Sequence, residues 1–188
     1  MRIIAGVYRG RTIKSVGGRL TRPTLDQVKE AVFNTLGQFF DGGIVLDLYA
    51  GSGNLGLEAL SRGCEKVVFV DQSYQAIQVI KENIEILNVG EKTEVYKLNA
   101  ATALKKIQAK QTQFDLVFLD PPYEKQQLND VISSLMDNNL IKNDGFIVCE
   151  TSKKEDLIDG YKDLTKLKES IYGITKISIY KREGVRCE

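Results

Sequence analysis

The chain has 188 residues, of which 43% are hydrophobic and 27% charged, as expected for a water-soluble globular domain with a core of its own. It contains no histidine, so catalytic schemes built on a histidine base are excluded, and we expect no metal site. No apolar run approaches the roughly 18 residues of a membrane span, and the first residues do not resemble a signal peptide. We therefore expect a cytoplasmic protein without membrane contact.

The first 43 residues are predicted to form a small basic extension. Ile3-Ile4 and Thr12-Ile13-Lys14 can pair as a hairpin, and Thr24, followed by Gln27, reads as the capping box of a helix. The glycines of Asp41-Gly42-Gly43 close this unit. Only two acidic side chains precede residue 41. The seven basic side chains in the same segment are Arg2, Arg9, Arg11, Lys14, Arg19, Arg22 and Lys29. Such a lobe is typical of a protein that contacts a polyanion from one side, although it could equally be a solvated surface.

From residue 44 onward, strands alternate with helices. The predicted strands are 44–49, 66–70, 95–98, 114–119 and 145–150; the predicted helices are 54–62, one capped by Ser73, 100–110 and 127–138. Residues 169–172 and 175–180 flank Gly173 as a hairpin. Repeated strand–helix units predict a Rossmann-like α/β fold, with a mostly parallel, doubly wound sheet and an antiparallel C-terminal edge hairpin. We expect residues 44–188 to be the catalytic domain.

A glycine-rich loop follows the first of these strands. Gly51, Gly53 and Gly56 match GxGxxG, which is equally a dinucleotide fingerprint. Asp47 is a carboxylate inside a buried strand, which is costly without a partner. It could accept backbone N–H bonds from the loop, or reach the cationic end of a ligand. S-adenosylmethionine offers such a cation, whereas the pyrophosphate of a dinucleotide would be repelled.

Three further residues complete the predicted cofactor site. Asp71 ends the second strand, where a carboxylate can accept both ribose hydroxyls of an adenosine. Asn99 ends the third strand and could meet the adenine ring, and Tyr49 lies in the loop itself. Asp71 could instead cap the helix that begins near Ser73, and Asn99 could be an ordinary turn residue.

Asp120-Pro121-Pro122-Tyr123 follows the fourth strand, at the sheet edge where open α/β sheets bind ligands. An aromatic amine is a poor nucleophile until hydrogen-bond acceptors help its nitrogen to pyramidalise. Asp120 supplies one acceptor, and the carbonyl of Pro121 supplies another, held rigidly by the fixed φ of the two prolines. Tyr123 can stack on a base brought out of its helix. The alternative is a Pro-Pro turn without chemistry.

Asp47–Gly53 together with Asp120–Tyr123 resembles the amino-methyltransferases that act on adenine N6, cytosine N4 or guanine N2. The N-terminal segments narrow the resemblance to the bacterial family that methylates one guanine N2 of 16S ribosomal RNA: Arg2–Gly6, Arg9-Gly10-Arg11, Arg22-Pro23-Thr24 and Lys29–Asn34. The resemblance implies S-adenosyl-L-methionine as cofactor and 16S rRNA, in a partly assembled small ribosomal subunit, as partner. It also implies that the basic segment engages RNA, and we assign this role to Arg2, Arg9, Arg11 and Arg22.

We expect a monomer that transfers the methyl group in one in-line step, without a covalent enzyme intermediate. Cys64, Cys149 and Cys187 form neither a disulfide framework nor a metal knuckle and stand in no motif suited to attack on a base. Three alternatives remain open. The same fold could act on DNA adenine or on protein glutamine, the glycine loop could serve a nicotinamide-dependent oxidoreductase, or the chain could be a non-catalytic RNA-binding module.

Overall fold

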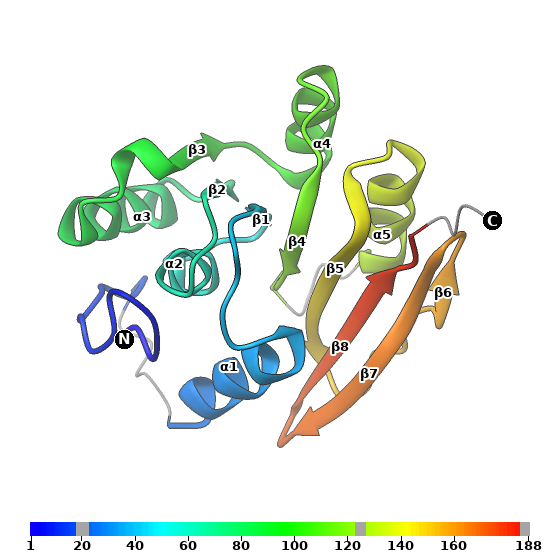
Figure 1. The fold of residues 1–188 in the computed structure, drawn as a ribbon, viewed down its shortest axis with the longest axis horizontal. Helices are drawn as coiled ribbons and strands as arrows, with labels where there is room; N and C mark the ends of the chain where they lie inside the picture. The colour runs from blue at the N-terminus through cyan, green and yellow to red at the C-terminus, as the bar shows by residue number, and fades with distance from the viewer. Residues whose placement is uncertain (18–22, 123–126, 185–188) are drawn as a thin grey trace.

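A computed structural model describes residues 1–17, 23–122 and 127–184 (Figure 1). Within these residues, eight strands form a single sheet in the order β3-β2-β1-β4-β5-β8-β7-β6. The strands are β1 (Ile44–Asp47), β2 (Lys66–Asp71), β3 (Thr93–Lys97), β4 (Phe114–Leu119), β5 (Ile141–Ser152), β6 (Gly160–Tyr161), β7 (Leu164–Tyr172) and β8 (Thr175–Arg182). The helices are α1 (Pro23–Leu36), α2 (Asn54–Ser61), α3 (Tyr74–Leu87), α4 (Ala100–Ala109) and α5 (Leu128–Asp137), with a short 3-10 turn at Gly90–Lys92.

The sheet reverses its winding between β1 and β4. The first five strands pair in parallel, with β2 and β3 on one side of β1 and β4 and β5 on the other. The last three strands pair antiparallel, with β8 against β5. The predicted fold class is therefore confirmed. A reversal of this kind opens a crevice at the carboxyl ends of the two central strands, where α/β proteins bind ligands.

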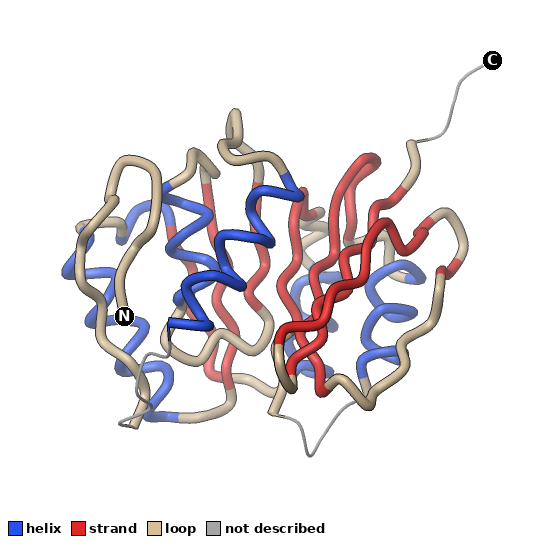
Figure 2. Tube along the Cα trace, turned by 90° about the horizontal axis from the view of Figure 1, so that it is seen from below, coloured by secondary structure: helices blue, strands red, loops and turns tan. Residues whose placement is uncertain are grey.

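Helices cover both faces of the sheet (Figures 1 and 2). On one face α1, α2 and α3 share an apolar core with the sheet, to which Phe33, Leu57 and Ile80 each contribute a fully buried side chain. On the other face α4 and α5 pack against the sheet through Ile107 and Leu135. Burial of each of these large side chains stabilises the fold by about 1.5–3 kcal/mol. In the described ranges no helix has the length and apolarity that a membrane span needs.

Several predicted details hold, and others are wrong. Ser73 caps α3 by accepting the N–H of Ala76 at 3.3 Å. Helix α1 begins at Pro23, so Thr24 lies inside its first turn rather than at the cap; a proline fits there because its missing N–H would have no intrahelical partner. Strand β5 begins at Ile141 rather than Gly145. A register irregularity between Phe114 and Leu116 of β4 accommodates the polar residues 142–144 of β5. Strand β6 was not predicted.

The N-terminal segment folds back onto the sheet domain. Its hairpin pairing is confirmed, but as a single bridge between Arg2 and Thr12 rather than as two strands. The turn then docks on the end of α2, where the N–H of Val7 donates to the carbonyl of Ser61 at 2.8 Å. Gly6 has φ +85° at this contact, and a Cβ there would stand 1.7 Å from that same carbonyl oxygen. Only glycine permits so close an approach.

Substitution of Gly6 by alanine tests this docking, and Gly10 provides a matched control. Gly10 has φ +80°, but a Cβ there would meet nothing within 4 Å. Gly10→Ala should therefore lower the free energy of unfolding only by the left-handed backbone cost of about 1–2 kcal/mol. Gly6→Ala adds a steric clash with backbone and should cost at least about 3 kcal/mol. Urea unfolding measures both; equal losses would contradict the close approach.

Candidate active site

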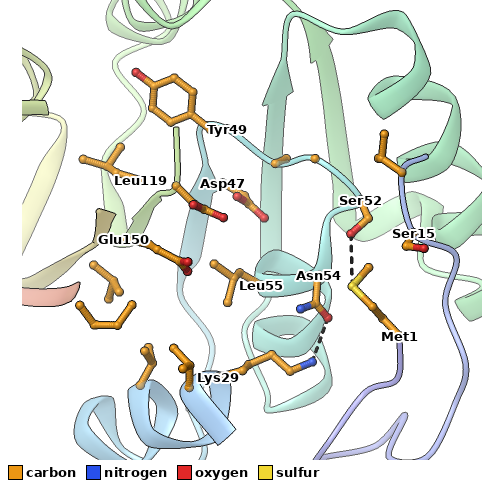
Figure 3. A pocket seen from close by; sticks show the side chains of 18 residues that line it. Met1, Ser15, Lys29, Asp47, Tyr49, Ser52, Asn54, Leu55, Leu119 and Glu150 are labelled. Carbon is orange, nitrogen blue, oxygen red and sulfur yellow. Dashed lines mark hydrogen bonds between the residues drawn. The ribbon is translucent and has the colours of Figure 1, made fainter. Parts of the chain in front are cut away.

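A cavity of about 210 Å³ lies at the winding reversal, over the carboxyl ends of β1, β4 and β5 (Figure 3). Four of the residues predicted from the sequence line it, namely Asp47, Tyr49, Gly51 and Asp120. Glu150, two residues before the end of β5, and Lys29, from α1, also line it, although neither was predicted as a site residue. The fold therefore brings the glycine loop and the start of the Asp-Pro-Pro-Tyr motif to one place.

Asp47 is buried, with 2% of its surface exposed, and its carboxylate accepts the N–H of Gly56 at 3.0 Å. It thus holds the glycine loop, the first of the two roles that the sequence left open. Burial raises the pKa of Asp47 to about 7; the Gly56 N–H opposes this effect, and the nearby charge of Asp71 adds to it. A carboxylate in this state would gain from a cation in the cavity.

Asp71 holds the other side of the same loop. Its carboxylate accepts the N–H of Gly51 at 2.9 Å and the N–H of Ser73 at 2.8 Å. Gly51 has φ +55°, and a Cβ there would meet nothing within 4 Å, so the loop leaves open space on its cavity side. Gly53 has φ 77° as the N-cap residue of α2. A carboxylate accepts about four hydrogen bonds, so Asp71 retains capacity for ribose hydroxyls.

Asn99 occupies a capping position. Its side-chain oxygen accepts the N–H of Thr102 at 2.9 Å and so begins α4. The amide oxygen that was expected to meet an adenine amine is therefore already engaged with backbone. Its role toward a cofactor stays a prediction.

The predicted catalytic motif begins directly after β4. Asp120 is exposed on the cavity side, Pro121 is buried and Pro122 is exposed. Tyr123 lies outside the described residues. Because Leu119 pairs with Cys149 in the parallel register, the next residues along the two strands are Asp120 and Glu150, one strand spacing apart.

The N-terminal segment is joined to the glycine loop through Asn83, which is fully buried in α3. Its side chain accepts the N–H of Lys14 at 2.7 Å and donates to the carbonyls of Lys14 and Ser52 at 3.0 and 2.9 Å. Asn83 was not among the residues predicted for the site. The available signal was an amide that falls on the otherwise apolar stripe of α3, three residues after Ile80.

A second junction is the buried carboxylate of Glu58 on α2. It pairs with Lys29 at 2.9 Å and Arg62 at 2.8 Å, and it accepts the backbone N–H groups of Ile4 and Ala5 at 2.9 and 3.0 Å. Burial alone would raise the pKa of Glu58, but the charge of Lys29 and these donors hold it below the ordinary value. The carboxylate is therefore ionised and ties the N-terminal segment, α1 and α2 together.

Three of the four predicted RNA-contacting arginines lie in the N-terminal turn-and-bridge segment, residues 1–13. Arg2, Arg9 and Arg11 are all exposed. Arg2 stands 3.4 Å from Asp26, and the Arg11 guanidinium donates to the carbonyl of Ile86 at 2.6 Å. Arg22 lies outside the described residues.

Two of the cysteines are buried and free. Burial raises the pKa of the Cys64 thiol to about 12 and also raises the pKa of Cys149. Neither can therefore supply a thiolate nucleophile near neutral pH. Cys187 lies outside the described part of the chain. Over the described part, no cluster of acidic or cysteine side chains is suited to hold a metal ion.

Asp47→Asn should change how stability depends on pH. Because the folded pKa of about 7 exceeds the ordinary 3.8, the native state binds the extra proton. The wild type therefore loses stability as pH rises from about 4 to 7, by up to about 4 kcal/mol. Asparagine keeps an acceptor for the Gly56 N–H and does not ionise. The free energy of unfolding of Asp47→Asn, relative to that of the wild type, should therefore rise by about 2–3 kcal/mol between pH 5 and pH 8.

Urea unfolding at the two pH values measures the effect, with Asp41→Asn as an exposed control that should show no comparable gain. A stability difference between Asp47→Asn and the wild type that stays constant with pH would show that Asp47 is already ionised in the fold.

Comparison with known proteins agrees with the geometry. The family model described as Conserved hypothetical protein 95 matches residues 1–181. The Bacillus subtilis protein YlbH is 44% identical over 98% of this chain and 100% of its own length. Ribosomal RNA small subunit methyltransferase D of Haemophilus influenzae is 39% identical over 96% of this chain and 93% of its own. The solved structure of the Escherichia coli protein yhhF, 31% identical, has a TM-score of 0.84 over 98% of both chains. The chain belongs to the Conserved hypothetical protein 95 family, that of the bacterial ribosomal RNA small subunit methyltransferases D.

Proposed function

We propose that this protein is an S-adenosyl-L-methionine-dependent methyltransferase that methylates the exocyclic N2 amine of one guanine in 16S rRNA. The observation that carries the proposal is that Asp120 lines the same cavity as Asp47 and Gly51, at the winding reversal of the sheet. Membership of a family whose named members act on small-subunit ribosomal RNA supports the choice of substrate. This substrate also favours a cytoplasmic location.

The residues of the cavity fit this cofactor. Gly51 leaves open space where any other residue would place a Cβ. The carboxyl groups of Asp47, Asp120 and Glu150 line the cavity, and a bound cation would stabilise their ionised forms, while the Lys29 ammonium that also lines it is committed to Glu58 and to Asn54. This lining favours a sulfonium cation and disfavours the pyrophosphate of a nicotinamide dinucleotide. We assign the ribose hydroxyls to Asp71, whose two backbone N–H bonds leave acceptor capacity on its carboxylate.

S-adenosyl-L-methionine supplies the methyl group and a neutral thioether leaving group. The chain's own residues must activate the amine. The Asp120 carboxylate would accept a hydrogen bond from one N2 hydrogen and the Pro121 carbonyl a hydrogen bond from the other, so that the nitrogen lone pair leaves the ring system and is free to react. A bound S-adenosyl-L-methionine would supply the methyl group to this nitrogen, and Asp120 or solvent would take the proton that the amine releases. Orientation and exclusion of water provide most of the acceleration.

Substrate engagement is assigned to the N-terminal extension, residues 1–43, and catalysis to residues 44–188. The exposed guanidinium groups of Arg2, Arg9 and Arg11 are suited to phosphate contacts, which position RNA without reading its sequence. We assign Arg22 to the same surface, and Tyr123 to stacking on the target base. Because Glu58 ties this extension to α2 and Asn83 ties it to the glycine loop, RNA held there would lie on the same rigid body as the cofactor site. The functional unit is proposed to be a monomer acting on a partly assembled small subunit.

Asp120→Asn separates catalysis from cofactor binding. The variant keeps the size of the side chain but loses the charge that accepts the amine proton, so methyl transfer to ribosomal RNA should fall on the order of 10²-fold or more. Affinity for S-adenosylhomocysteine should change less than about threefold, because that ligand carries no sulfonium charge. Single-turnover methylation and titration calorimetry measure the two quantities.

The control is Asp130→Asn, the same change at an exposed position in the first turn of α5. It should leave both quantities unaltered. Undiminished methyl transfer by Asp120→Asn would overturn the assigned chemistry.

A further inference from the structure

Glu150 is a carboxylate in the cavity that the mechanism above leaves without a role. It lies in β5, two residues after Val148 on the same face, and it pairs in register with Ile177 of β8. All three of these residues line the cavity. Figure 3 shows Glu150 and Asp47 pointing into this cavity from two different strands. Glu150 is therefore built into the site rather than lying on an outer surface.

The carboxylates around the cavity differ in what they already bind. Asp47 accepts a backbone N–H from Gly56, and Asp71 accepts two, from Gly51 and Ser73. Across residues 1–17, 23–122 and 127–184 we find no hydrogen bond or ion pair to the Glu150 carboxylate. Burial raises the pKa of Glu150, as expected where donors are lacking. Its oxygens face the cavity with acceptor capacity for a ligand.

The edge of a guanine matches this acceptor. Guanine presents the N1–H and the N2 amine side by side, and both are donors. Adenine at N1 and cytosine at N3 present a lone pair instead, which a carboxylate repels. Asp120 and Glu150 follow paired residues of neighbouring parallel strands, about 4.8 Å apart. One base edge can span that distance, so the two carboxylates can contact neighbouring donors of the same base.

We infer that Glu150 is a specificity-determining residue, which accepts the N1–H of the target guanine while Asp120 accepts a proton of its N2 amine. This inference rests on the proposed function and deepens it. The Asp-Pro-Pro-Tyr motif serves any conjugated amine and cannot choose among bases. The Glu150 carboxylate on the neighbouring strand can select the base, because it accepts a hydrogen bond from a base with a proton on N1 and repels a base with a lone pair there.

A base analogue tests the inference. 2-Aminopurine keeps the 2-amino group of guanine but has a lone pair at N1. Either base is placed at the mapped target position of small-subunit RNA by ligation, and the RNA is assembled into particles. The wild type should methylate guanine at least about 30-fold faster than 2-aminopurine, as expected for loss of a hydrogen bond to a charged group.

Glu150→Gln should narrow that preference at least about tenfold, because glutamine loses the charge and can donate its amide N–H to N1 of 2-aminopurine. Affinity for S-adenosylhomocysteine should stay within about twofold of the wild type. Glu85→Gln, the same change at an exposed position of α3, is the control and should keep the wild-type preference.

Two results would overturn the inference. An unchanged guanine to 2-aminopurine ratio in Glu150→Gln would remove Glu150 from base recognition. A weakened affinity for S-adenosylhomocysteine with that ratio intact would assign the carboxylate to the ammonium group of the cofactor instead. Failure of the wild type to methylate the guanine-containing particle would refute the proposed function itself, so the two failures are distinguishable.

Discussion

The ion pairs and hydrogen bonds of the buried Glu58 carboxylate fix how the N-terminal segment, α1 and α2 pack together. The carboxylate is fully buried and takes two cationic partners, Lys29 from α1 and Arg62 from its own helix, together with two N–H groups of the N-terminal segment. A buried charge is tolerated only when it is paired and its remaining lone pairs are satisfied. All of these donors must therefore be in place together, which fixes the N-terminal segment and α1 against α2.

This constraint extends to the site. Lys29 also donates to the side chain of Asn54 at 2.8 Å, at the start of α2, and Asn83 joins Lys14 to Ser52 of the glycine loop. The loop is thus held by Asp47 and Asp71 from the sheet and by Asn83 from α3. The N-terminal segment contributes to the same apolar core as the sheet through Ile3 and Ile13. A segment that looks like an appendage in sequence is packed as part of the same body as the sheet and its cavity.

Local patterns in the sequence predicted the fold and four of the residues that line the cavity. A buried strand followed by glycines placed Asp47 and Gly51, and a serine before an apolar stripe placed the cap of α3. Long-range pairing could not be read in this way: Lys29 and Glu58 are far apart in sequence, and only the spacing of Glu58 and Arg62 was a local sign of contact. The cap of α1 was misplaced because Thr24 and Gln27 imitate a capping box one residue beyond a helix start that proline had already set.

Glu150 shows what the same reasoning could have found. Asp47 interrupts an apolar strand and Asp120 follows one, and Glu150 likewise follows three buried apolar residues of β5. No known motif surrounds Glu150, so the local sequence does not predict a role for it. The polar ends of β1, β4 and β5 belong to one edge of a parallel sheet, so a carboxylate on any of them faces the same crevice.

We propose that the protein uses this cavity to transfer a methyl group to guanine N2 of small-subunit ribosomal RNA. The most direct measurement uses cells that lack the gene for this protein as the source of substrate. Small ribosomal subunits and their precursors, DNA and protein from these cells are each incubated with purified protein and S-adenosylmethionine labelled in its methyl group. Mass spectrometry then identifies the labelled product. We expect one N2-methylguanine in 16S rRNA and no label elsewhere; label in DNA adenine, in protein glutamine or at another position of a base would refute the proposed function.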